Sequence, residues 1–167
     1  MKIKPAKNKL VDLDIAVEAS EWTSALSNAQ ALCTQALDAL YALKPELKIG
    51  ELSLALVDDA AIQALNREYR AKDRATNVLS FPALHNIPEM PMLGDIVVAY
   101  ETTSKEAVEK GIDLSDHFTH LFIHGFLHLQ GYDHETAQDA EIMESLEVSV
   151  LEALEIKNPY VLTQDVL

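Results

Sequence analysis

Residues 116–134 of this 167-residue chain read DHFTHLFIHGFLHLQGYDH and hold five of its six histidines. The stretch predicts a helix that is capped by Ser115 or the aspartate after it and that ends at Gly131, because glycine readily adopts the conformation that terminates helices. At about 100° per residue, the four histidines from His117 to His128 share an arc of about 80° on one helical face. Such a stripe is a poor core, since an unsatisfied buried polar group costs roughly 1–3 kcal/mol.

Three of these histidines have the spacing of metal ligands. His124 and His128 are four residues apart, so their rings lie one turn apart on one face and can present two nitrogens to one ion. The turn at Gly131 lets His134 complete three sides of a tetrahedron. The fourth side stays open for water, as in catalytic zinc sites. We therefore predict one zinc ion held by three histidines and water, although nickel and copper accept the same ligands.

The remaining histidines and the nearby aspartate receive different expectations. His117 and His120 lie upstream of the ligands, and we expect them at the surface, supporting the ligands or contacting substrate rather than binding the ion. Asp133 is expected to be a turn aspartate, with the orientation of a ligand imidazole as the alternative. His85 is expected to be a loop residue in a proline-rich segment.

The same histidine spacing also occurs in the metzincin proteases, whose pattern is H-E-x-x-H-x-x-G-x-x-H. In this chain the position of the glutamate is occupied by Gly125. That glutamate acts as the general base in proteases of this class, so its replacement removes the residue that peptide hydrolysis most needs. The pattern keeps the metal site and weakens the peptidase alternative.

Upstream of the histidines, the hydrophobic pattern alternates between strands and helices. Strands are predicted at 11–17, 51–57, 77–81 and 95–100, with a loop rich in proline between the last two. One helix is predicted from Ser24 to Leu43, and another begins at Asp58 or Asp59 and carries Ile62, Leu65 and Tyr69 on its core face.

After the histidines, a last helix is predicted from about Glu135 to Leu154. Its apolar stripe consists of Met143, Leu146, Val150 and Leu154, with Glu141, Glu144 and Glu147 facing water. The order of elements along the chain indicates an α/β or α+β sheet with helices packed against it.

Length and composition fit one globular domain covering residues 1–167, with 49% hydrophobic and 24% charged residues. Cys33 is the only cysteine, so no internal disulfide can form and a reducing compartment fits. Asp12, Asp14 and Glu18 interrupt the apolar run that a signal peptide needs, and no run of 18 apolar residues predicts a membrane span. These features favour the cytosol.

The formal net charge of −14 is unusual for a protein that binds phosphates. The basic residues are concentrated, however, since four of 13 fall within eight positions: Arg67, Arg70, Lys72 and Arg74. This cluster fits a local phosphate-binding patch, and it fits equally a solvated helix end whose cations interact with the helix dipole.

Three blocks of the sequence resemble the YbeY family of bacterial rRNA-maturation endoribonucleases. Residues 124–134, HGFLHLQGYDH, match its signature HGxLHLxGYDH. Residues 66–82, NREYRAKDRATNVLSFP, are similar to its N-x-x-Y-R-x-K-D-x-x-T-[DN]-V-L-S-F-P block, and residues 93–96 match its L-G-D-I segment. Asn77 stands where many members have aspartate.

The resemblance implies an α/β (α+β) fold with a small mixed sheet of about four strands and about five helices, the metal-binding helix lying near the C-terminal third. It implies a zinc-dependent endonuclease for single-stranded RNA that matures the 3′ end of the small-subunit rRNA and acts in ribosome quality control. His124, His128 and His134 match the metal ligands, and Arg70 matches an arginine important for activity.

From these residues we expect Arg70 to stabilise the phosphate in the transition state, and Arg67, Lys72 and Arg74 to guide the RNA backbone. The expected partners are single-stranded RNA, rRNA and the small ribosomal subunit, without DNA or membrane; the oligomeric state stays open. Two alternatives remain: a metzincin-like metallopeptidase, and a non-catalytic ribosome-assembly factor in which the metal only braces the fold.

Overall fold

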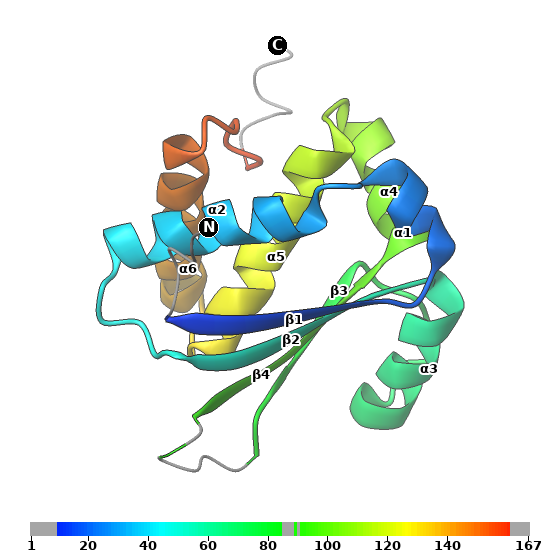
Figure 1. Ribbon diagram of the computed structural model, residues 1–167, viewed down its shortest axis with the longest axis horizontal. Helices are drawn as coiled ribbons and strands as arrows, with labels where there is room; N and C mark the ends of the chain where they lie inside the picture. Colours follow the sequence, from blue (N-terminus) through cyan, green and yellow to red (C-terminus); the bar gives the residue numbers. More distant parts are fainter. Residues whose placement is uncertain (1–9, 85–88, 90, 161–167) are drawn as a thin grey trace, which may run out of the picture.

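The computed structural model describes residues 10–84, 89 and 91–160. They form a four-stranded sheet in the order β1-β2-β4-β3, which confirms the predicted mixed sheet (Figure 1). Strands β1 (Val11–Val17), β2 (Gly50–Val57) and β4 (Met92–Ala99) are parallel, whereas β3 (Val78–Pro82) runs antiparallel to β4.

Within the described residues, six helices surround the sheet, against about five predicted. The helices α2 (Ala29–Leu43), α5 (Leu114–Leu129) and α6 (Ala137–Ala153) lie on one face, and α3 (Asp59–Arg70) lies on the other (Figure 1). The short helix α1 (Ser20–Ala25) and helix α4 (Tyr100–Lys110) lie beyond the ends of β1 and β4. The sheet is therefore covered on one face and only partly covered on the other.

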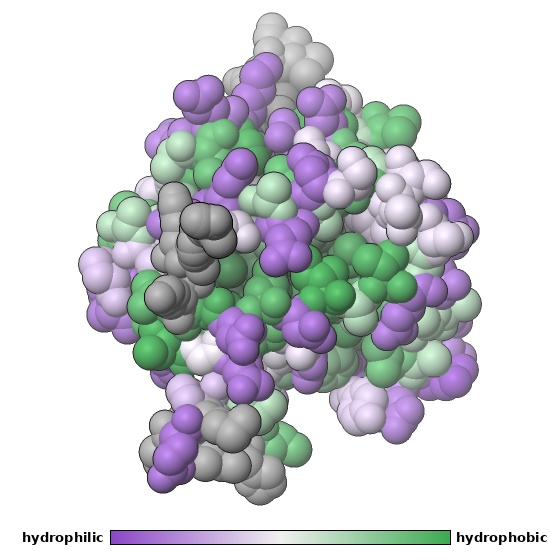
Figure 2. Space-filling model, viewed as in Figure 1, coloured by the Kyte–Doolittle hydropathy of each residue, from purple (hydrophilic) through white to green (hydrophobic). Residues whose placement is uncertain are grey.

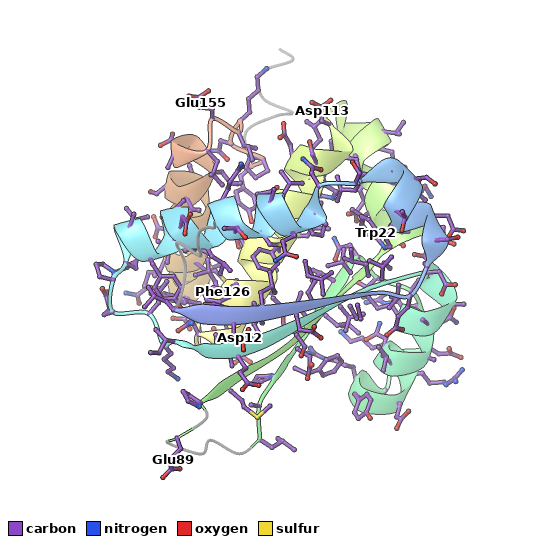
Figure 3. The ribbon with its side chains drawn as sticks, viewed as in Figure 1. Asp12, Trp22, Glu89, Asp113, Phe126 and Glu155 are labelled. Carbon is purple, nitrogen blue, oxygen red and sulfur yellow. The ribbon has the colours of Figure 1, made fainter. Side chains whose placement is uncertain are left out.

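The main core fills the layer between the sheet and α2, α5 and α6. Trp22 and Phe126 lie in this layer (Figure 3), and both are fully buried. Fully burying a large apolar side chain stabilises the fold by about 1.5–3 kcal/mol. A second, smaller core packs α3 onto the opposite face through Val57, Ile62, Leu79, Val97 and Ala99.

Helix α5 approaches the sheet closely at Gly125. The Ser80 hydroxyl on β3 donates to the Gly125 carbonyl over 3.1 Å, and a Cβ at Gly125 would lie 2.9 Å from that hydroxyl oxygen. The missing side chain therefore lets α5 lie directly against β3. This contact sets the histidine face of α5 beside β3, where the site is built.

Two helical predictions need correction. The helix predicted from Ser24 to Leu43 is interrupted, because α1 ends at Ala25 and α2 begins at Ala29. Ser27 and Asn28 lie in the break, and both residue types favour caps and turns over helix interiors. Helix α4 was not predicted; its sequence YETTSKEAVEK has only Thr103 and Ala107 as buried residues, so it carries no recognisable apolar stripe.

The element ends agree with the sequence only in part. Asp58 is the cap of α3, as one of two predicted residues, and its carboxylate accepts from the Ala61 amide over 2.9 Å. Helix α5 begins one residue before Ser115, after Asp113, whose side chain makes no capping hydrogen bond. The fourth predicted strand begins earlier, at Met92, and Tyr100 belongs to α4.

On the face shown in Figure 2, hydrophobic residues gather in a band across the middle of the molecule, at the level of β1 in Figure 1, with hydrophilic residues around it. Val17, at the end of this edge strand, is half exposed. Within the part of the chain that the structure describes, no helix combines the length and apolar character that crossing a bilayer requires.

Gly94 on β4 offers a test of the sheet geometry. Its φ is +138°, and a Cβ there would lie 2.3 Å from the Phe81 carbonyl oxygen on β3. We predict that Gly94→Ala lowers the free energy of unfolding by roughly 3 kcal/mol or more, since a strained φ and overpacking each cost about 1–3 kcal/mol. Urea unfolding measures the change.

The matched control is Gly111→Ala, because Gly111 also has a positive φ of +68° but an added Cβ meets no atom within 4 Å. This variant should lose clearly less stability. Equal losses in the two variants would contradict the proposed close approach of β3 and β4.

Candidate metal centre and its cavity

Three imidazoles converge at the C-terminal end of α5. His124 and His128 come from the last turns of the helix and His134 from the segment after it; one potential ligand atom from each lies within 4.8 Å of the other two. The Nε2 atoms of His124 and His128 are 3.2 Å apart. Two nitrogens bound at about 2.0–2.1 Å on adjacent corners of a tetrahedron are about 3.3 Å apart, so this separation suits a shared ion.

The turn after α5 brings His134 back toward the helix. Gly131 has a φ of +103°, a backbone conformation that side chains rarely adopt. The Gly131 amide donates to the His128 carbonyl over 3.0 Å, and the Tyr132 amide donates to the Leu127 carbonyl over 3.0 Å. These bonds satisfy the last carbonyls of the helix and reverse the chain, as the sequence predicted.

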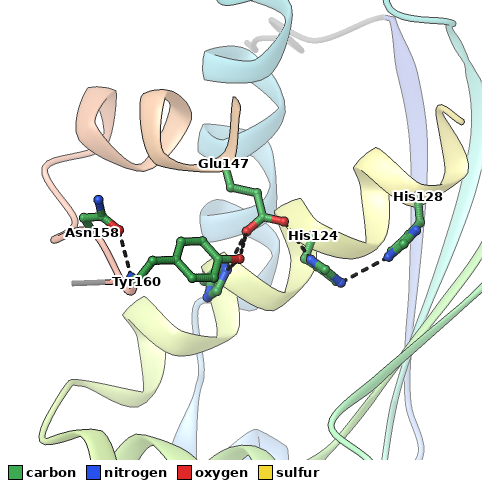
Figure 4. Close-up of polar contacts among 6 residues, drawn as sticks. His124, His128, Glu147, Asn158 and Tyr160 are labelled. Atoms are coloured by element: carbon green, nitrogen blue, oxygen red, sulfur yellow. Dashed lines mark hydrogen bonds and ion pairs between the residues drawn. The ribbon is translucent and has the colours of Figure 1, made fainter. Parts of the chain in front are cut away.

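Glu147 on α6 fixes the orientation of His124. The His124 Nδ1–H donates to Glu147 Oε2 over 2.7 Å, which leaves Nε2 free to bind a metal (Figure 4). The other carboxylate oxygen accepts from His120 Nε2 over 2.8 Å and from the Tyr160 hydroxyl. Tyr160 is held in turn by its amide, which donates to the Asn158 side chain over 2.8 Å.

The electrostatics of the cluster favour metal binding. Burial alone would raise the pKa of Glu147, but hydrogen bonds from His120, His124 and Tyr160 outweigh burial and lower its pKa to about 2. The carboxylate is therefore ionised and accepts a hydrogen bond from His124 Nδ1–H. Burial, and then the charges of His124 and His134, lower the pKa of His128, which favours the neutral imidazole that binds metals.

His117 and His120 are not surface residues, although a surface position was among the expectations. Their exposed fractions are 1% and 8%. His117 Nε2 donates to Glu106 over 2.8 Å, and His120 Nε2 donates to Glu147. Each buried imidazole therefore donates to a carboxylate, which for His120 is shared with His124, and neither belongs to the three-histidine cluster.

A cavity of about 520 Å³ opens beside the three histidines, between α5 and β3. Helix α5 contributes His117, His120, Leu121, His124 and His128, and β3 contributes Val78, Leu79, Ser80 and Pro82. Arg70, the last residue of α3, also lines it and is held there because its Nη2 donates to the Ser80 carbonyl over 2.8 Å. A cation and a candidate metal centre thus face one hollow.

The other basic residues of the cluster lie outside this cavity. Arg67, Lys72 and Arg74 are exposed, and Arg67 lies 3.6 Å from the Asp73 carboxylate. The loop that carries Lys72 and Arg74 is fixed by buried Asn66 on α3, whose side chain donates to the Arg74 carbonyl over 3.0 Å. The structure therefore brings Arg70 to the histidines and leaves the other three on the nearby surface.

Other residues singled out from the sequence have simpler positions. Asp133 accepts from the Glu135 amide over 3.3 Å, as a turn aspartate does. Asn77 lines the cavity and donates to Glu106 over 3.0 Å, a contact that a carboxylate at this position would turn into repulsion. His85, expected to be a loop residue, lies outside the described residues.

Glu147 was wrongly predicted to face water, whereas its exposed fraction is 0%. The sequence held the signal, because position 147 follows Met143 by four residues and precedes Val150 by three, and so belongs to the buried stripe. A carboxylate on an apolar stripe, with a histidine-rich helix elsewhere in the chain, indicates a buried polar pair. Tyr160 had no comparable signal.

Comparison with known proteins shows the family of the chain. The family model described as Endoribonuclease YbeY matches residues 14–155. The chain belongs to the YbeY family. Proteins named Endoribonuclease YbeY from Methylocella silvestris, Paramagnetospirillum magneticum and Agrobacterium fabrum are 50%, 45% and 47% identical to it, over 89%, 90% and 90% of this chain and 85%, 97% and 95% of their own.

The fold also resembles the solution structure of TM1509 from Thermotoga maritima. The TM-score is 0.53 at 23% identity, and the alignment covers 87% of this chain and 91% of that one. At this identity the likeness supports the fold alone.

The contact between Glu147 and His124 generates a prediction about metal binding. We predict that Glu147→Gln lowers the affinity for Zn²⁺ by 10- to 100-fold, the usual loss when a carboxylate that supports a ligand histidine is removed. The measurement is competition with a chromophoric chelator, and circular dichroism checks the fold of the metal-free variant.

Glu144→Gln is the matched control, because Glu144 lies on the same helix and is exposed. Unchanged Zn²⁺ affinity in Glu147→Gln would show that the carboxylate does not orient His124.

Proposed function

We propose that this protein is a zinc-dependent endoribonuclease that cleaves single-stranded RNA, matures the 3′ end of the small-subunit rRNA and acts in ribosome quality control. The observation that carries the proposal is the convergence of three imidazoles and Arg70 on one cavity in a member of this family. The RNA substrate follows from the endoribonuclease relatives. Action on ribosomal particles places the protein in the cytoplasm.

Zinc is the proposed ion because three neutral imidazoles with an open fourth side are a donor set typical of catalytic zinc. The ion would supply Lewis-acid activation of water at neutral pH. The chain's own contribution is to hold His124 in the correct tautomer through Glu147 and to present the open side to the cavity.

Arg70 is proposed to bind the phosphate at the cleaved bond. Its forked guanidinium group suits two phosphate oxygens, and the negative charge on those oxygens grows in the transition state. The hydrogen bond to the Ser80 carbonyl orients the side chain before substrate arrives. Arg67, Lys72 and Arg74 are proposed to guide the RNA backbone toward the cavity from the surface beside α3.

The two alternatives are less well supported. A metzincin-like peptidase needs a glutamate at position 125, where an added Cβ would meet Ser80 Oγ at 2.9 Å and Ile96 Cγ2 at 3.1 Å. A side chain there would therefore point into the contact between α5 and the sheet. A non-catalytic ribosome-assembly factor would leave the placement of Arg70 beside the histidine cluster without a purpose.

Two substitutions separate metal binding from catalysis. We predict that His124→Ala abolishes stoichiometric Zn²⁺ binding and RNA cleavage together. Arg70→Ala should keep the metal and lower the cleavage rate by about 10²–10³-fold, the usual effect of removing one donor to a transition-state oxyanion. Elemental analysis and cleavage of a labelled unstructured RNA measure the two effects.

Chelation and a second substrate provide the controls. Cutting should stop when zinc is removed and return when it is restored, whereas an assembly factor would bind ribosomal particles without ever cutting. Unfolded casein should remain intact with the metal-loaded protein. Wild-type cleavage rates in Arg70→Ala would refute the assigned role of Arg70.

A further inference from the structure

Two aromatic residues beside the cavity are not used by the metal centre. Tyr69 on α3 has an exposed fraction of 62%, although the sequence predicted it on the core face of the helix. Its ring makes an edge contact with Phe81 on β3, with 5.5 Å between the ring centroids. The Arg70 guanidinium carbon lies 5.6 Å from the centroid of the Phe81 ring. An exposed aromatic ring is thus held next to the cation that faces the histidines.

These rings lie in a second hollow of about 990 Å³ on the sheet face that α3 covers only in part. Arg70, Ser80 and Pro82 line both this hollow and the cavity of the histidines. The two spaces are therefore neighbours on either side of β3, with Arg70 bordering both. An RNA strand that places a phosphate at Arg70 has its next nucleotide within reach of Tyr69.

The charges around the second hollow select which part of a nucleotide enters it. Among the described residues, its lining includes four acidic residues, Asp14, Glu18, Glu51 and Asp95, and one cation, Arg70. A phosphate group would be repelled there, but an uncharged base would not. Arg67 lies two residues before Tyr69 on α3, and Lys72 and Arg74 lie in the loop after the helix. The RNA backbone therefore has a favourable path outside the hollow.

We infer that Tyr69, supported by Phe81, is a stacking platform for the base of a nucleotide that adjoins the phosphate bound by Arg70. The inference rests on the proposed function and names a part of its substrate site. Aromatic side chains bind bases of single-stranded RNA by stacking, with little sequence preference because every base has a π-face. A base paired within a duplex is already stacked and cannot reach Tyr69, so the platform favours single strands.

Substitutions at Tyr69 test the platform. Tyr69→Ala and Tyr69→Leu should raise KM for an unstructured RNA oligonucleotide by roughly 5- to 150-fold, the range for losing one stacked base, with kcat little changed. Tyr69→Phe should behave like the wild type, because it keeps the ring. Val108→Ala controls for the truncation of an exposed apolar residue. Val108 on α4 is 78% exposed and does not line the second hollow.

Abasic oligonucleotides identify the contact. Removing the base at one position beside the cleaved bond should raise KM for the wild type as much as Tyr69→Ala does, and the two changes together should add no further loss. The dependence of RNA binding on salt should be the same in Tyr69→Ala and the wild type, because no phosphate contact is removed.

The outcomes separate this inference from the proposed function. A wild-type protein that cuts no RNA overturns the proposed function, and the platform is then judged by RNA binding measured with the same variants. Wild-type cutting with an unchanged KM in Tyr69→Ala and Tyr69→Leu overturns the platform alone. In that case an apolar segment of a protein partner would be the remaining candidate to bind in the second hollow.

Discussion

The structure depends on one constraint: α5 is buried between the sheet and the helices α2, α4 and α6, yet one of its faces carries four histidines. A buried imidazole without a partner is costly, so each ring must receive one. His117 and His120 receive carboxylates from α4 and α6. His124, which also donates to Glu147, and His128 lie beside His134, where a metal ion can complete their bonding. The stripe is thus divided into a supporting half and a half that belongs to the candidate metal centre.

Glu147 links the two halves, because its carboxylate accepts from both His120 and His124. A buried carboxylate with these donors stays ionised and gives both rings a fixed orientation. The contact of α5 with β3 then determines what else surrounds the three imidazoles. Since Gly125 carries no side chain, β3 lies close enough for its Ser80 carbonyl to hold Arg70 at the cavity. The packing of α5 against β3 therefore also determines the position of Arg70 at the cavity.

Much of this arrangement could be predicted from the sequence. The spacing of His124 and His128 predicts that their rings share one helical face, and Gly131 predicts the end of the helix. The strands are predicted from the alternation of apolar and polar residues. Helix α4 could not be recognised, because it buries only small residues and a threonine. The partners of His117 and His120 come from α4 and α6, so they depend on how distant segments pack. The exposure of Tyr69 likewise depends on α3 covering only part of the sheet.

The central claim is that three imidazoles bind one ion that keeps an exchangeable water. X-ray absorption spectroscopy of the zinc-loaded protein tests it most directly. We expect three imidazole nitrogens and one oxygen at about 2.0–2.1 Å, with one imidazole lost in His134→Ala. Four protein donors around the zinc, or a spectrum unchanged by His134→Ala, would contradict it.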